Sequence, residues 1–430
     1  MSGWLVLTIS KFHSRKGVSF KKAILQVLLS NFTALIASSI STLLLAKALG
    51  IYEFGILGLL LVIQNIFMIP IKALQPGLLI CYNESMKTKT SRASVFWTKQ
   101  LQNDFTLRIL ISIGLMIASA IAYLSFIFWL NWDVGSWPLF LFIYLQAVGF
   151  AFEKRILLNL QMRKKFFYFA LLASFNRLFK GLSFVILFSL GQLNLTTAIA
   201  MTGIASFLII IFQLKSFAVV RVSHFYQLFE NWFLIKKSFW PGLSELIVQL
   251  GARSGILVLQ LVGGVATVGI LAFAEVLIGA LSQISQAVIS VFSPKILELN
   301  NAKKLDGIFI KVGGGGALCL IVLGFLGLPI IQFLFPIKYS LVWLCFIGML
   351  PGLAASYIAS FPVVKLHGMQ FQKALFIIEL LGVFVTLGCL SVVELPLHAA
   401  LAWSVGRVVY LFGAFFLWFN YKKELLVEGI

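Results

Sequence analysis

The chain has 430 residues, of which 60% are hydrophobic, and its mean hydropathy is +1.02. Apolar runs of about 20 residues, the length that crosses a bilayer, recur along it, so a soluble globular protein is excluded. The formal net charge of +20 would indicate nucleic acid binding in a soluble protein. In a membrane protein the distribution of charge over the two sides explains it better, and no nucleic acid partner is expected.

The apolar runs predict an all-α polytopic membrane protein with about 12 transmembrane helices. Glycine, proline and charged residues gather in the short segments between the runs, as expected for connections. The predicted spans are residues 23–46, 54–80, 105–130, 138–160, 166–190, 197–221, 242–262, 268–293, 308–332, 340–361, 374–393 and 397–420.

Basic residues are distributed unequally over the two sides of these spans. With a cytoplasmic amino terminus, the inward segments carry 27 lysines and arginines, and the outward segments carry only Lys47 and Lys338. The positive-inside rule therefore predicts that both termini are cytoplasmic. The outward connections are only a few residues long, which leaves no room for an extracytoplasmic catalytic domain.

A weak internal repeat divides the chain into two related halves. Residues 43–57 align without gaps on residues 257–271, which places Gly50 on Gly264 and Gly55 on Gly269. The repeat predicts two lobes of six helices each, with a central cleft between the repeated hairpins. The N-terminal lobe is expected at 1–221 and the C-terminal lobe at 242–430. The cytoplasmic linker 222–241 between them is aromatic and basic, and is expected to lie at the membrane interface.

Charged residues inside the spans are the first candidates for function, because charge at membrane depth usually faces a bundle interior or a water-filled cavity. Five cations against three carboxylates give an excess of two positive charges, which predicts a cationic cleft. The cations are Lys72, Arg177, Lys180, Arg253 and Arg407, and the carboxylates are Glu245, Glu275 and Glu379.

Arg177 and Lys180 carry the main functional prediction. They lie one turn apart on one face of the fifth span, which has no acidic residue. Two like charges at this depth indicate an anionic ligand, for which arginine supplies a planar fork and lysine a compact charge. The alternative is that Lys180 extends to the headgroups while Arg177 binds backbone carbonyls. Lys72 likewise either binds an anionic ligand or extends to the headgroups.

Two charge pairs have structural interpretations as well as functional ones. Arg253 and Glu275 lie eleven residues before and after Gly264, which puts them at equal depth in adjacent antiparallel helices. A salt bridge and a role in ligand binding or ion coupling are therefore both open. For Glu379 and Arg407 a structural pair is favoured.

Uncharged polar residues extend this pattern. Glu245, Gln249, Arg253 and Gln260 share one face of the seventh span, and the eighth span has a polar face of its own. These faces are expected to line the central cleft with polar residues of the first two spans. The polar residues of the eighth span include Ser282, Gln283, Gln286 and Ser290.

The first hairpin, LLLAKALGIYEFGILGLLL, resembles that of the Wzx-type O-antigen and capsule repeat-unit flippases of the multidrug/oligosaccharidyl-lipid/polysaccharide exporter superfamily. That family has a basic residue, Leu-Gly, a short turn and a second glycine, and Lys47, Leu49, Gly50 and Gly55 occupy these places. Residues 239–297 are similar to the seventh and eighth helices of the family. Two features depart from its pattern: Leu271 stands where a tyrosine is often found, and the turn after Gly264 has no charge.

The resemblance implies a carrier in the bacterial inner membrane that moves an undecaprenyl-pyrophosphate-linked oligosaccharide to the outer leaflet by alternating access. Its partners would be the lipid-linked oligosaccharide and the lipid bilayer, with a polysaccharide polymerase and a chain-length regulator as candidate protein partners. No cofactor or metal is expected, and a proton or sodium gradient is the candidate energy source. A multidrug or solute antiporter of the same superfamily is the nearest alternative. A membrane-embedded polymerase or glycosyltransferase is less favoured, so the chain is not expected to be an enzyme.

Overall fold

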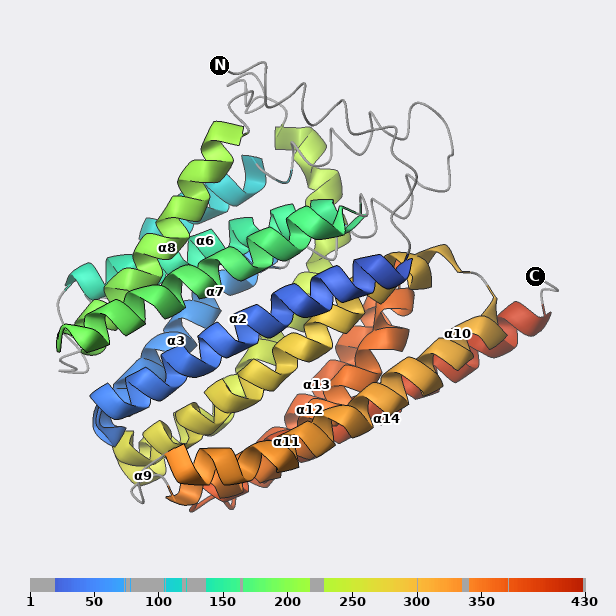
Figure 1. The fold of residues 1–430 in the computed structure, drawn as a ribbon. Helices are drawn as coiled ribbons and strands as arrows, with labels where there is room; N and C mark the ends of the chain where they lie inside the picture. Colours follow the sequence, from blue (N-terminus) through green and yellow to red (C-terminus); the bar gives the residue numbers. More distant parts are fainter. Residues whose placement is uncertain are drawn as a thin grey trace.

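The computed structural model describes residues 20–72, 74, 78, 104, 106–117, 121, 137–162, 165–216, 228–299, 301–334, 340–369 and 371–427. Every regular element within these residues is helical (Figure 1). Seven of the helices are long and apolar enough to cross a membrane, and three shorter apolar helices accompany them. The prediction of an all-α polytopic membrane protein is confirmed.

A described helix lies in each of the twelve predicted spans, because α9 contains two of them and α10, η3 and α11 together form one. Most of residues 73–80 and 118–130, the ends of two predicted spans, lies outside the described residues. The N-terminal half contains α2 (Phe20–Ala48), α3 (Ile51–Lys72), the helix Thr106–Ile117, α6 (Trp137–Met162), α7 (Phe166–Ser189) and α8 (Leu195–Ser216). The C-terminal half contains α9 (Leu228–Glu298), α10 (Ala302–Ile308), the π-helix η3 (Phe309–Gly314), α11 (Gly315–Leu334), α12 (Ser340–Gly368), α13 (Gln372–Leu390) and α14 (Pro396–Val427).

Glycine marks the turn in both copies of the repeat. α2 ends just before Gly50, whose backbone N–H donates to Glu53 Oε2 at 3.0 Å and so caps the start of α3. α9 is interrupted at Gly264, where φ is 75°. Glycine is favoured there because the left-handed region disfavours residues with a side chain. Residues 228–263 are called the first arm of α9 below, and residues 265–298 the second arm.

The helices form two lobes that meet at α9. In the N-terminal lobe α2 packs on α7 and α6 packs on α8, and in the C-terminal lobe α14 packs on α12 and α13. α9, drawn in yellow in Figure 1, contacts α12 and α13 on one side and α2 and α3 on the other. α9 begins at Leu228, inside the segment predicted as the linker, and the domain limits at 221 and 242 remain predictions.

The lobes touch closely at two glycines that the repeat relates to each other. A Cβ atom built on Gly55 would lie 2.1 Å from the carbonyl oxygen of Val265, and one built on Gly269 would lie 2.2 Å from that of Ile51. The 214-residue offset places Ile51 on Val265 and Gly55 on Gly269, so each copy presents a glycine to the same carbonyl of the other. We call these four residues the glycine contact. A buried apolar cluster surrounds this end of the molecule, and it includes Leu49, Phe54, Leu259, Val268 and Phe273.

Three basic residues that sequence analysis assigned to inward loops are buried. Arg108 Nε and Arg155 Nε each lie 2.9 Å from Asp104 Oδ2, and the three side chains are at most 2% exposed. Lys365 Nζ donates to the carbonyl oxygen of Leu299 at 2.6 Å, just beyond the end of α9. These charges stabilise the packing of neighbouring helices, so the 27 inward charges are not all loop charges.

Candidate functional site

A cavity of about 350 Å³ lies between the two lobes. The N-terminal lobe lines it with α2, α3, α6, α7 and α8, and the C-terminal lobe lines it with the second arm of α9. Phe54 and Phe184 line the cavity and also belong to the buried apolar cluster around the glycine contact. The packed cluster at the contact between the lobes therefore closes the cavity on that side.

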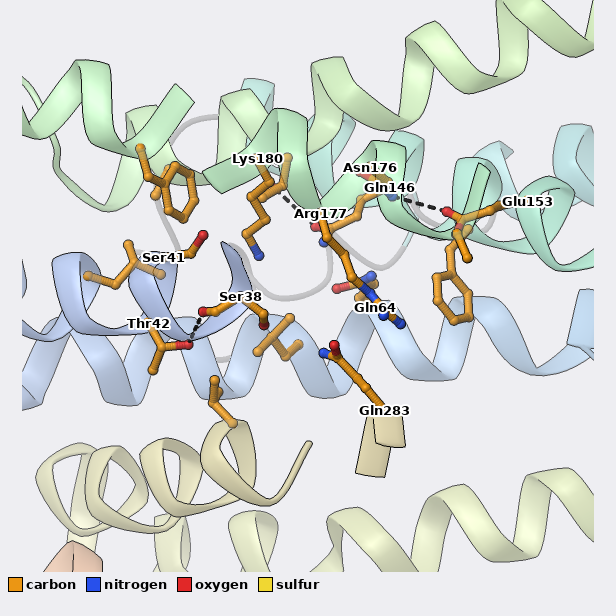
Figure 2. Close-up of a pocket in the computed structure, with 18 of the residues that line it drawn as sticks. Ser38, Ser41, Thr42, Gln64, Gln146, Glu153, Asn176, Arg177, Lys180 and Gln283 are labelled. Atoms are coloured by element: carbon orange, nitrogen blue, oxygen red, sulfur yellow. Dashed lines mark hydrogen bonds between the residues drawn. The ribbon is translucent and has the colours of Figure 1, made fainter. Parts of the chain in front are cut away.

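Four charged side chains among the described residues line this cavity, and all four belong to the N-terminal lobe. Arg177 and Lys180 of α7 and Glu153 of α6 are shown in Figure 2, and Lys154 of α6 also lines the cavity. These three cations and one carboxylate sum to a net charge of +2 over the described residues of the cavity wall. Arg177 and Lys180, both predicted to face the cleft, lie in this wall.

Several contacts of the charged residues in the cavity wall are defined. Asn176 Nδ2 donates to Glu153 Oε2 at 3.1 Å, and Lys154 and Arg177 act on the same carboxylate electrostatically. Lys180 Nζ lies 5.4 Å from the centroid of the Phe184 ring, a cation–π contact. In the described part of the chain, no carboxylate lies within ion-pair distance of Lys180. The Lys180 side chain points into the cavity (Figure 2).

Glu153 and Lys154 were missed as site residues by sequence analysis. Lys154 was assigned to an inward loop, and Glu153 was counted neither in a loop nor in a span. The signal was present, because Gln146, Phe150, Glu153 and Leu157 follow the i, i+4, i+7, i+11 spacing of one helix face, and all four line the cavity. Of the eight charged residues predicted within the spans, only Arg177 and Lys180 are among the described residues that line the cavity.

Uncharged polar groups complete the wall. Thr202 Oγ1 donates to the carbonyl oxygen of Ile199 at 2.8 Å and also lies 3.2 Å from Gln146 Oε1. Gln283 Oε1 is buried and has no hydrogen-bond partner among the described residues. Gln286, predicted to face the cleft, does line the cavity, as do Gln64 and Asn176. Amides and hydroxyls of this kind suit a ligand that both donates and accepts hydrogen bonds.

Several predicted site residues lie elsewhere. Arg253 Nη1 and Glu275 Oε2 form an ion pair, one of the two interpretations that sequence analysis left open, and neither residue lines the cavity. Gln249 is half-buried on the first arm of α9, which contributes none of the described residues lining the cavity. The polar face of the seventh span therefore does not face the cleft. The side chains of Lys72 and Glu245 lie outside the described part of the chain.

Glu379 and Arg407 line a second, much smaller cavity inside the C-terminal lobe. It lies between the first arm of α9, α13 and α14. The Arg407 guanidinium carbon lies 5.6 Å from the centroid of the Trp403 ring, within range of a cation–π contact. Among the described residues no three His, Cys, Asp or Glu side chains are grouped to hold a metal ion.

The Arg253–Glu275 pair is expected to stabilise the fold, since removing one partner leaves the other charge without compensation. The side chains are 24% and 14% exposed, so Glu275→Met alone should cost about 2 kcal/mol, between the values for exposed and buried pairs. Arg253→Met with Glu275→Met should restore most of this loss. Thermal unfolding of the purified variants measures both. Single variants as stable as the parent would show that the pair serves something other than stability.

Solved transporter structures share this fold. No protein-family model matches the chain, and no curated protein matches its sequence. A multidrug resistance MATE-family transporter of the MOP superfamily, in an outward-facing conformation, superposes with a TM-score of 0.69 at 14% identity over 95% of this chain and 99% of its own. A MATE transporter of Vibrio cholerae gives 0.64 at 15% identity over 94% and 98%. The lipid II flippase MurJ, in an inward closed conformation, gives 0.60 at 17% identity over 91% and 86%.

The chain has the fold of these transporters. At such low identity the likeness describes the fold and does not transfer a substrate. It does establish the arrangement in which the cavity sits, a multi-pass helical membrane protein with two lobes around a central cleft.

Proposed function

We propose that the chain is a flippase that carries an undecaprenyl-pyrophosphate-linked oligosaccharide from the cytoplasmic to the outer leaflet of a bacterial inner membrane. The observation that carries the proposal is the net charge of +2 on the wall of the cavity between the lobes. A pyrophosphate esterified at both ends carries two negative charges at neutral pH, which this wall balances. Arginine and lysine together suit a phosphate group, through bidentate hydrogen bonds and a compact charge respectively.

Alternating access supplies the mechanism of the proposal. The cavity is closed beside the glycine contact, so release on that side requires the two lobes to separate there. Rocking of one lobe against the other about a central site is the general mode of such carriers. A proton or sodium gradient is the candidate energy source, and protonation of Glu275 with loss of its pair to Arg253 is one candidate coupling step. In the proposed pathway the glycan is an O-antigen or capsule repeat unit, passed on to a polymerase and a chain-length regulator.

A multidrug or solute antiporter is the second candidate, and two observations favour it. Glu153 places a carboxylate in the cavity, and Phe54, Phe150, Phe169 and Phe184 line it as well, a combination that suits an aromatic or lipophilic cation. The three cations oppose it, since like charges in a site of low dielectric constant repel such a ligand.

Binding by the purified protein in nanodiscs separates the two candidates. We expect farnesyl diphosphate to bind saturably and more weakly as salt is raised, because screening weakens the attraction between opposite charges. The lipophilic cation tetraphenylphosphonium should not compete with it. Saturable binding of the cation without binding of the diphosphate would favour the antiporter and contradict the flippase.

A further inference from the structure

The two lobes contribute different chemistry to the cavity. All four charged side chains lie on α6 and α7 of the N-terminal lobe. The second arm of α9 contributes only uncharged residues, which are Val276, Gln283, Gln286, Ala287 and Ser290. A ligand that contacts both walls must therefore present an anionic group to one lobe and an uncharged group to the other.

Gln283 is the polar group on the uncharged wall whose hydrogen bonding is incomplete. Its Oε1 atom is buried and accepts no hydrogen bond from any described residue. Leaving a buried acceptor unpaired is unfavourable, so a ligand that donates to it gains the hydrogen bond and relieves that cost. Figure 2 shows the Gln283 amide extending from α9 toward Arg177 and Gln64 on the opposite wall. The acceptor is thus directed toward the side of the cavity that carries Arg177.

We propose that Gln283 recognises the sugar directly attached to the diphosphate, by accepting a hydrogen bond from a hydroxyl or acetamido N–H group of that sugar. This inference rests on the proposed function and assigns the sugar specificity to the C-terminal lobe. Gln286, three residues further along the same arm, also lines the cavity and is placed to bind the same sugar. The cations of the N-terminal lobe hold the diphosphate.

The size of the cavity limits what is recognised. Its volume of about 350 Å³ lies near the lower end of the range of roughly 300–1,000 Å³ found for ligand pockets. The diphosphate and the first sugar fill such a space, and the remaining sugars of the repeat unit extend beyond it. Discrimination by Gln283 therefore concerns the first sugar and not the rest of the glycan.

The test compares two probes of equal charge that differ in the sugar. The methyl ester of farnesyl diphosphate and farnesyl diphosphate bearing N-acetylglucosamine, both diesters with two negative charges, are bound to the full chain in nanodiscs. The unaltered protein should bind the sugar-bearing probe more tightly. Gln283→Leu should weaken binding of that probe by about tenfold, the effect of one hydrogen bond and one unpaired group, and should leave binding of the methyl ester unchanged.

Gln260→Leu is the matched control. Gln260 lies on the first arm of α9, outside the cavity lining, and its Oε1 atom also has no partner among the described residues. This variant should bind both probes as the unaltered protein does. If Gln283→Leu weakens both probes equally, or neither, the inference is wrong while the proposed function stands. If the unaltered protein binds neither probe, the proposed function itself is wrong.

Discussion

Replacement of Arg177 by Gln together with Lys180 by Met is expected to abolish transport of a diphosphate-linked substrate. Both side chains line the cavity from α7, and together they supply two of its three positive charges. A hydrogen bond to a charged group is worth about 1.5–3 kcal/mol, so loss of both should reduce affinity by roughly 10²- to 10⁴-fold. Surface polysaccharide in a cell that depends on this chain should fall to the level of a null strain.

The matched control removes the same charge from the surface of the C-terminal lobe. Lys303 and Lys304 are exposed at the start of α10, and their double replacement by Gln should leave export intact. Stability provides a second control, because a cation without a counter-charge does not hold the fold together. Lys180→Met should therefore unfold at the same temperature as the parent or higher. Full export by the Arg177/Lys180 double variant at normal expression would show that the cavity does not bind an anion.

Replacement of Gly55 and Gly269 by alanine is expected to shift the protein toward the state in which the lobes are apart at the glycine contact. Alanine at Gly55 and Gly269 would place Cβ atoms 2.1 and 2.2 Å from backbone carbonyl oxygens of the opposite lobe. Backbone cannot yield as a flexible side chain does, and overpacking of this kind costs about 1–3 kcal/mol. A shift of that size changes the ratio of the two states roughly 5- to 150-fold, so transport should fall severely.

Spin labels can follow this shift directly. Tyr52 and Val262 are each 61% exposed near the two turns, so cysteines at these positions in a cysteine-free background report the separation of the lobes. The double glycine variant should show a longer distance distribution than its parent. Gly279→Ala is the control on the second arm of α9, because a Cβ there meets no atom within 4 Å. An unchanged distribution in the double glycine variant would mean that this contact does not control opening.

Local sequence signals predicted the fold well. Apolar runs have the length that the bilayer requires, and glycine at positions 50 and 264 marked both turns of the repeat. The Arg253–Glu275 pair was also readable, because equal spacing about one turn fixes equal depth. These features depend only on neighbours along the chain.

The site was predicted less completely, because membership of a cavity depends on how helices are rotated and packed. Sequence analysis assigned Arg108 and Arg155 to inward loops, whereas in the structure both form ion pairs with the buried Asp104. Glu153 lies near a run of basic residues at the end of a span, where charge alone does not show whether its side chain faces the cavity. Hydropathy likewise does not show that the first arm of α9 faces the C-terminal lobe and the second arm faces the cavity.

The most direct test of the flippase proposal is movement of a fluorescent polyprenyl-diphosphate-linked sugar across the membrane of liposomes that contain only the purified chain. The account predicts that the labelled lipid becomes accessible to an added quencher much faster than in protein-free liposomes. It also predicts that the Arg177→Gln, Lys180→Met double variant removes this acceleration and that the Lys303→Gln, Lys304→Gln control keeps it. Equal rates with the chain and with the Arg177/Lys180 variant would contradict the central claim that the cationic cavity carries the substrate.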